Sequence, residues 1–364
     1  MEKAKEYISL AAFAIVPFGF ISLGLIHVGQ FYTFVLAGML MLAAQARNNF
    51  VAAFGIYVFI WQVFIFLYAM VTPSAPKTLV ILSYGQTIYI IIGLAVYYMT
   101  AKSRITNRLF FNVICVSALI QATICISQSL GFDPVPALIS LWSKTEGKLP
   151  ATMMTGSLGN PNFVGAYMAI SIPFFLRKRW AWCLAVIIPT LVFTFSSSAM
   201  IPALIGLVIW WRPTREMMVR AAVACVVLCL AYAILIDNPV WLNDRPQFWM
   251  QAIKGVTATV FTAIFGMGPG ASWGHPYPVH SEWIGTFHHF GLIGTAIMLG
   301  YFGTIGRRYF RGDVAGRNEL KILIAALAII AVNMAGNSAL HYGPTSMLIC
   351  TAAGLLEREM YAAA

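Results

Sequence analysis

At 364 residues, the chain is 60% hydrophobic and only 10% charged. Soluble domains carry roughly 25% charged residues, so this composition excludes an ordinary soluble enzyme. The apolar runs are continuous and do not alternate with polar residues, which favours spanning helices over barrel strands, the other structure that satisfies its backbone polar groups in lipid. The prediction is therefore a single all-α integral membrane domain covering residues 1–364.

In chain order, twelve apolar segments approach the length of about 20 residues that a spanning helix needs. They are residues 8–27, 29–46, 50–71, 78–99, 109–130, 161–176, 180–196, 199–211, 217–236, 282–305, 320–340 and 343–356. Three of them, 161–176, 199–211 and 343–356, are short, so ten or eleven true crossings remain an alternative. The first segment is expected to act as an uncleaved signal anchor.

The basic residues are distributed unevenly between the predicted loops. With the N-terminus in the cytoplasm, 18 of the 23 Lys and Arg residues fall on the cytoplasmic side. The five on the outer side are Lys77, Lys144, Lys148, Arg245 and Lys254. This asymmetry satisfies the positive-inside rule and predicts that both termini are cytoplasmic. The net charge of +11 then reflects topology and contact with anionic lipid, and no nucleic-acid partner is expected.

Two of the predicted outer loops are long, namely residues 131–160 and 237–281. Most connections between the predicted spans are short, so two long loops on one face indicate a function there. Within the second loop, residues 246–266 alternate apolar with polar side chains. That pattern predicts a helix lying along the membrane interface.

Metal and cofactor chemistry finds little support in the sequence. The six cysteines lie inside apolar runs without CxxC or CxxH spacing, and the chain has no DxD motif. We interpret the cysteines as small buried hydrophobic residues. No metal and no cofactor is expected.

Polar residues suited to catalysis gather on the outer side. All six histidines map to outer loops or to the outer ends of spans. Arg245 stands just before Pro246 in the second long loop, His280 ends that loop, and the sequence GMGPG (266–270) lies between them. The outer face is therefore the candidate site.

Four motifs in order carry a family resemblance. They are GSLGNPNFVGAYMAISIPFF (156–175), RPQFWMQAI (245–253), GMGPG, and His280 followed by Gly291 and Gly294. Their order, spacing and outer location resemble the O-antigen ligase and polymerase superfamily across residues 150–300. The resemblance implies a bacterial inner-membrane protein with its active site on the periplasmic face.

The resemblance also implies a reaction. Members of this superfamily are metal-independent glycosyltransferases that move a glycan from an undecaprenyl-diphosphate carrier to an acceptor hydroxyl on lipid A-core, another carrier-linked glycan or a protein. By analogy, Arg245 would hold the donor diphosphate and His280 would be the base on the acceptor hydroxyl. A guanidinium stabilises the charge of a departing diphosphate, and an imidazole is a base near neutral pH.

One position departs from the family pattern. In TFSSSAM (194–200), Ser197 stands where the family usually has an arginine. If the donor needs two cations, Lys254, Lys144 or Lys148 must supply the second, or the activity is altered or absent.

Other candidate residues have two readings each. His289 stands where the family often has Glu; with His288 it either lines the site or makes structural hydrogen bonds inside the bundle. Glu282 is an alternative base to His280. Trp249 belongs to an aromatic belt at the headgroups or stacks on a sugar. Gly291 is expected, with Gly294, to be a packing position.

Asn160 and Asn162 flank Pro161. This sequence is typical of a helix start with Asn160 as the N-cap, and a contact from either amide to the donor is the alternative.

Two other functions remain open. A polymerase would differ from a ligase only in its acceptor, which one sequence does not reveal. Twelve spans with both termini inside also describe transporters and flippases. Transporters tend to show related halves and charges near the midplane, and neither is visible here.

Overall fold

The computed structural model describes residues 48–71, 77–132, 154–158, 160–194, 196–210, 245–268, 281–311, 318–336 and 343–361. These ranges are almost entirely helical and contain no strand, which confirms the all-α prediction. The predicted segments 8–27, 29–46 and 217–236 lie outside the described residues, as does most of the first long loop.

The described helices follow the predicted segments closely. They are α3 (Asn49–Val71), α4 (Lys77–Lys102), α5 (Asn107–Ser129), η2 (Gly156–Leu158), α7 (Pro161–Phe175), η3 (Ala181–Cys183), α8 (Leu184–Phe193), α9 (Ser197–Trp210), α11 (Arg245–Val256), α12 (Val260–Phe265), α13 (Glu282–Phe310), α14 (Asn318–Gly336) and α15 (Gly343–Tyr361). Within the described ranges, α5, α13 and α14 are long and apolar enough to cross a membrane. These apolar helices are typical of a membrane protein.

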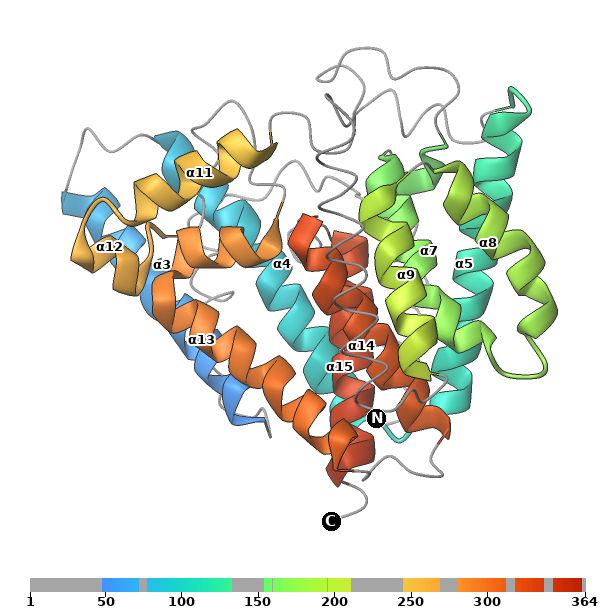
Figure 1. Ribbon diagram of the computed structural model, residues 1–364. Coiled ribbons are helices and arrows are strands. Elements are labelled where there is room, and N and C mark those ends of the chain that lie inside the picture. The colour runs from blue at the N-terminus through green and yellow to red at the C-terminus, as the bar shows by residue number, and fades with distance from the viewer. Residues whose placement is uncertain are drawn as a thin grey trace.

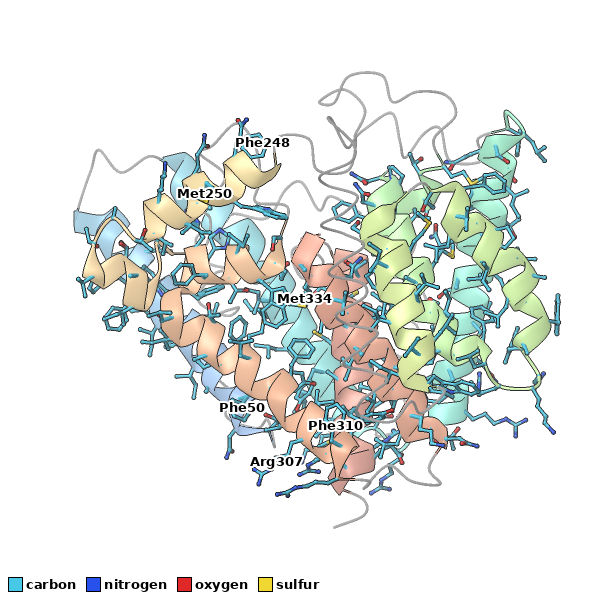
Figure 2. The ribbon with its side chains drawn as sticks, viewed as in Figure 1. Phe50, Phe248, Met250, Arg307, Phe310 and Met334 are labelled. Atoms are coloured by element: carbon cyan, nitrogen blue, oxygen red, sulfur yellow. The ribbon has the colours of Figure 1, made fainter. Side chains whose placement is uncertain are left out.

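The helices form three neighbouring groups (Figure 1). Helices α5, α7, α8 and α9 make one side of the bundle, α3, α11, α12 and α13 make the other, and α4, α14 and α15 lie between them. Arg307 and Phe310 lie at one end, and Phe248 and Met250 at the opposite end (Figure 2). We call the first the inner end and the second, which carries α11, the outer end.

Helix α7 is the centre of the larger core. Every residue from Val164 to Phe175 is buried, so the helix is surrounded by protein on all sides. Its 15 residues rise only about 22 Å, less than the hydrocarbon thickness of about 30 Å. Because α7 is shielded from lipid by its neighbours, this short length carries no mismatch with the bilayer.

Small residues bring the central helices close together. An added Cβ at Gly165 of α7 would lie 2.8 Å from the Cβ of Ser196 and 3.0 Å from that of Ala199, and one at Gly206 of α9 would overlap Ile329 of α14. Close approach through small residues is the usual way in which helices pack in a membrane, where no hydrophobic effect drives their association.

A cluster of polar side chains joins the helix ends at the inner end of the bundle. Arg358 of α15 donates to two backbone carbonyls between α4 and α5 at 2.8 and 2.7 Å, and also to the side chain of Asn107. Asn107 donates in turn to Glu319 at 2.7 Å and to Glu359 at 2.6 Å. Burial lowers the pKa of Arg358, whereas Glu359 and Glu319 raise it. The cluster joins four helix ends through charge-assisted hydrogen bonds.

Candidate functional site

The predicted interfacial helix over 246–266 is two helices, so that prediction was wrong in its extent. Helix α11 ends at Val256, and α12 begins at Val260. Thr259 caps α12, because its side chain accepts from the Thr262 amide at 3.1 Å while the Thr262 hydroxyl accepts from the Thr259 amide at 3.3 Å. This reciprocal pair is a capping box, and it starts a new helix where the sequence pattern suggested continuity.

The two helices present different surfaces. On α11, the polar side chains of Gln247, Gln251 and Lys254 are exposed, whereas Ala252 and Val256 are buried. On α12, the apolar side chains of Val260 and Phe261 are 78% and 56% exposed. Exposed apolar side chains beside an exposed polar face suit a position at the headgroup region of a bilayer.

Helix α13 is broken at Gly291, which has φ 62° and ψ −161°. The break divides it into a first half, residues 282–290, and a second half, residues 292–310. A Cβ at Gly291 would overlap the Ile264 carbonyl, and it would lie 2.5 Å from the amide nitrogen of Gly266. A Cβ at Gly294 would overlap Phe290. Gly291 is therefore a packing position, as predicted, and it also permits the break. At Gly294 the overlapping atoms belong to the same helix, so its role in helix packing stays a prediction.

Helix α11 and the first half of α13 lie side by side across the outer end and run in the same direction (Figure 1). Near the C-terminal end of α11, a Cβ at Gly255 would lie 3.8 Å from Nε2 of His288, which is close to the break. Since their C-terminal ends lie close together and they run in the same direction, α11 and the first half of α13 also begin on the same side. One begins at Arg245, and the other at Glu282 after its N-cap, Ser281.

His288 and His289 face the protein interior, as a polar group at membrane depth requires. Both are 2% exposed, and their ring centroids lie 5.3 Å apart. Both rings therefore lie inside the described bundle and not on its exposed surface, and the choice between the two roles stays a prediction.

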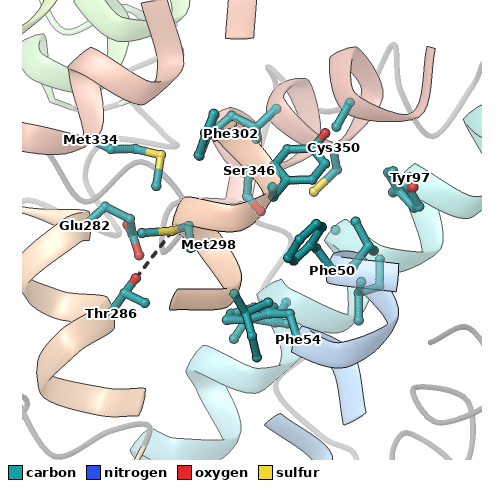
Figure 3. A pocket seen from close by; sticks show the side chains of 18 of the residues that line it. Phe50, Phe54, Tyr97, Glu282, Thr286, Met298, Phe302, Met334, Ser346 and Cys350 are labelled. Atoms are coloured by element: carbon teal, nitrogen blue, oxygen red, sulfur yellow. Dashed lines mark hydrogen bonds between the residues drawn. The ribbon is translucent and has the colours of Figure 1, made fainter. Parts of the chain in front are cut away.

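Glu282 also points inward. It is 2% exposed and lines a cavity of about 150 Å³ between α3, α4, α13, α14 and α15. Figure 3 shows its carboxyl beside Thr286, whose hydroxyl donates to the sulfur of Met298 at 3.7 Å. Most of the cavity wall is apolar. The carboxyl of Glu282 thus faces this cavity and not the exposed surface, and its role as the alternative base stays a prediction.

Asn160 and Asn162 serve the start of α7. The Asn160 side chain accepts from the Asn162 amide at 2.9 Å, with Pro161 in the first helical position. The Asn162 side chain accepts from the Ser196 hydroxyl at 3.0 Å, and Asn333 donates to the Ser198 carbonyl at 2.6 Å. The structural reading, a capped helix start, is confirmed. The amides also connect α7 to the serine turn before α9 and, through it, to α14.

Two glutamines at this end were missed by the sequence analysis. The Gln128 side chain accepts from the amides of Thr155 and Gly156 at 3.1 and 2.8 Å and donates to the Gly156 carbonyl at 3.2 Å. Gln121 accepts from the Ser157 amide at 3.1 Å. They hold the turn before α7 against α5. Their spacing of two helical turns on one face of an apolar helix was the available signal.

The remaining candidates divide between described and undescribed positions. Lys254 is exposed on α11, and Trp249 is half-buried, with no acceptor for its indole N–H among the described residues. Arg245 is the first residue of α11 and Ser197 the first of α9, but their side chains lie outside the described part. His280, Lys144 and Lys148 lie outside it entirely.

Within the described ranges, no group of three His, Cys, Asp or Glu side chains is placed to hold a metal ion. The four cysteines in these ranges are unbridged; Cys115, Cys125 and Cys183 are buried and Cys350 is half-buried.

The fold and the outer end together define an α-helical protein of membrane type, in which two short helices cover a broken helix. The chain matches no protein-family profile and no curated protein sequence.

Proposed function

We propose that the chain is a glycosyltransferase of the O-antigen ligase type, which moves a glycan from a polyprenyl diphosphate to an acceptor hydroxyl. One observation carries the proposal. The helix that Arg245 begins and the half-helix that follows His280 lie side by side, run in the same direction and begin at the same end. Arg245 and His280, at the starts of these two helices, would then supply a cation and a base to the same surface.

The proposed reaction is a single inverting displacement. The acceptor oxygen forms a bond to the anomeric carbon while the bond from that carbon to the diphosphate oxygen breaks. The imidazole of His280 takes the acceptor proton, and the guanidinium of Arg245 stabilises the negative charge on the leaving polyprenyl diphosphate. No metal and no cofactor takes part.

The site requires a second cation if one guanidinium does not suffice for the diphosphate. Lys254 is the described candidate, because it is exposed and belongs to the same helix as Arg245. Lys144 and Lys148 are the other candidates. We assign the outer end to the periplasmic face of a bacterial inner membrane, with twelve spans and both termini in the cytoplasm, on the basis of the charge pattern.

The test is product analysis with purified protein in lipid nanodiscs. The donor is a defined undecaprenyl-diphosphate glycan, and the acceptors are lipid A-core and a second carrier-linked glycan, which separate ligase from polymerase. We expect Arg245→Ala and His280→Ala each to lower the transfer rate at least 100-fold. Lys178→Ala, which removes an exposed cation at the inner end, serves as the control. Normal transfer by both outer-end variants would falsify the assignment.

A transporter or flippase is the second candidate, and the break in α13 favours it. Discontinuous helices form the substrate sites of many transporters. Movement of a labelled lipid-linked glycan across empty proteoliposomes, without any transfer product, would support transport and contradict glycosyl transfer.

A further inference from the structure

The break in α13 leaves backbone carbonyls without their helical partners. In an α-helix the carbonyl of residue i accepts from the amide of residue i+4, and Gly291 interrupts this pattern. In a bilayer every such carbonyl needs another donor within the protein. Two of them find it in the chain after α12: the Met267 amide donates to the His288 carbonyl at 2.9 Å, and the Gly268 amide donates to the His289 carbonyl at 3.0 Å.

Helix α3 supplies the other donors. The Tyr57 hydroxyl lies 2.7 Å from the Phe265 carbonyl and 3.2 Å from the Phe290 carbonyl, so its one proton serves both acceptors. The indole N–H of Trp61 donates to the Phe265 carbonyl at 2.9 Å. Tyr57 and Trp61 are one helical turn apart and share a face of α3. They therefore link the last residue of α12 to the last residue before the break in α13.

Glycines allow the backbones to meet at this point. Gly266 and Gly268 both have φ +90°, a conformation that side chains disfavour. A Cβ at Gly266 would lie 2.5 Å from the Phe290 amide nitrogen, and one at Gly268 would lie 3.2 Å from the Trp61 ring. The first part of the GMGPG motif thus has a structural reason, which is the approach of the α12 end to the α13 break.

We infer that Tyr57 and Trp61 are positioning residues for the outer-end reaction. By holding the Phe265 and Phe290 carbonyls, they fix the unit of α11 and α12 on the first half of α13. They thereby set the distance between the start of α11, at Arg245, and the start of α13, which follows His280. This inference rests on the proposed function, because Tyr57 and Trp61 touch no substrate in it and act only through the spacing of the two helices.

The test compares Tyr57→Phe, Trp61→Phe and their double variant with Tyr309→Phe. Tyr309 is a matched control, because its hydroxyl also donates to a backbone carbonyl, that of Ile209 at 2.8 Å, but on a part of α13 remote from the break. In the nanodisc assay we expect kcat to fall about 10-fold in each single variant and more in the double variant, with KM for the donor within about twofold, since misplacement by 1 Å can cost about 100-fold in rate. Tyr309→Phe should retain the wild-type kcat.

A second measurement reads the contact itself. Hydrogen–deuterium exchange at the Met267 and Gly268 amides should be faster in the double variant and unchanged in Tyr309→Phe. The inference requires both the lower kcat and the faster exchange, and either change without the other overturns it. If the wild-type protein transfers no glycan while its two amides are protected, the proposed function itself is wrong, and the positioning role is lost with it.

Discussion

The start of α7 and the break in α13 are two interruptions of helical structure at the same end of the molecule, and they are stabilised by different chemistry. Around α7 the acceptors are the side chains of Asn160, Asn162 and Gln128, and the donors are backbone amides and the Ser196 hydroxyl. Around the break in α13, most are backbone groups brought together by glycines, with two donors from α3. Side-chain capping tolerates replacement by another polar residue, but a glycine contact does not tolerate an added Cβ.

The two regions also differ in their apolar support. The turn before α7 rests on the larger core, in which α5, α7, α8, α9, α14 and α15 interlock. The break in α13 rests on a small separate cluster, consisting of Val58, Trp61, Ile65, Leu94 and Phe290. We therefore expect the α7 region to lose stability in graded steps and the α13 region to fail at once when its backbone contacts are blocked.

The largest effect is expected from Gly291→Ala. The substitution places a side chain at a positive φ and against the Ile264 carbonyl, so a loss of at least about 2 kcal/mol in the free energy of unfolding follows. Thermal melting in detergent, monitored by fluorescence-detected size-exclusion chromatography, measures this loss of stability. Gly303→Ala on the same helix is the control, because a Cβ there meets nothing within 4 Å. A gain of up to about 1 kcal/mol is expected from it. If Gly291→Ala and Gly303→Ala melt at the same temperature, the close contact at Gly291 does not support the structure. The expected difference between the α7 and α13 regions is then wrong.

Gln128→Leu should have the next largest effect. It removes three hydrogen bonds to the turn before α7 and leaves two amides without acceptors, at a cost of roughly 2 kcal/mol. The same melting assay applies. Ser129→Ala removes one exposed hydrogen bond from the end of the same helix and should cost well under 1 kcal/mol. If Gln128→Leu lowers the free energy of unfolding no more than Ser129→Ala does, Gln128 does not hold the turn before α7 against α5.

Asn160→Ala tests the cap of α7 more finely. Loss of this N-cap should cost about 1 kcal/mol, and Asn160→Ser should recover most of it. If Asn160 also contacts the donor, Asn160→Ser will restore the melting temperature but not the transfer rate. Melting and transfer measured on the same preparation separate the two roles.

The smallest effect on stability is expected from Lys254→Ala. Its side chain is exposed, so the free energy of unfolding should change by no more than about 0.5 kcal/mol. If Lys254 supplies the second cation, KM for the donor should rise several-fold at constant stability. An unchanged KM would assign that role elsewhere, with Lys144 and Lys148 as the next variants to measure.

The sequence predicted the helices well because apolar length is a strong signal. Every predicted span that falls on described residues overlaps a helix, and the N-cap at Asn160 was readable from its neighbour Pro161. The end of α11 and the break in α13 were not predicted. Both depend on contacts between distant segments: α12 turns to meet α13, and Gly291 is one glycine among many until Ile264 is seen against it.

The sequence indicated where the candidate residues lie better than the direction in which their side chains point. Composition and motif order directed attention to the outer end, where the described candidates Lys254, Trp249 and Asn160 do lie. Whether a polar side chain faces outward or inward is decided by helix packing, which is why Glu282 could be taken for a surface base although it lines an internal cavity. Tyr57 and Trp61 had no local signal, because their partners are about 200 residues away in the chain.

The contact between α4 and α15 has a consequence for biogenesis. A Cβ at Gly354 would lie 2.6 Å from the Tyr97 carbonyl, so the backbones of the two helices nearly touch, and Arg358 closes the same seam. Helix α4 precedes α15 by many other helices in the chain, so it is synthesised well before α15. Chains are synthesised from the N-terminus at about 5–20 residues per second, so this face of α4 waits many seconds for α15. The contact between α4 and α15 therefore forms only after α15 has left the ribosome.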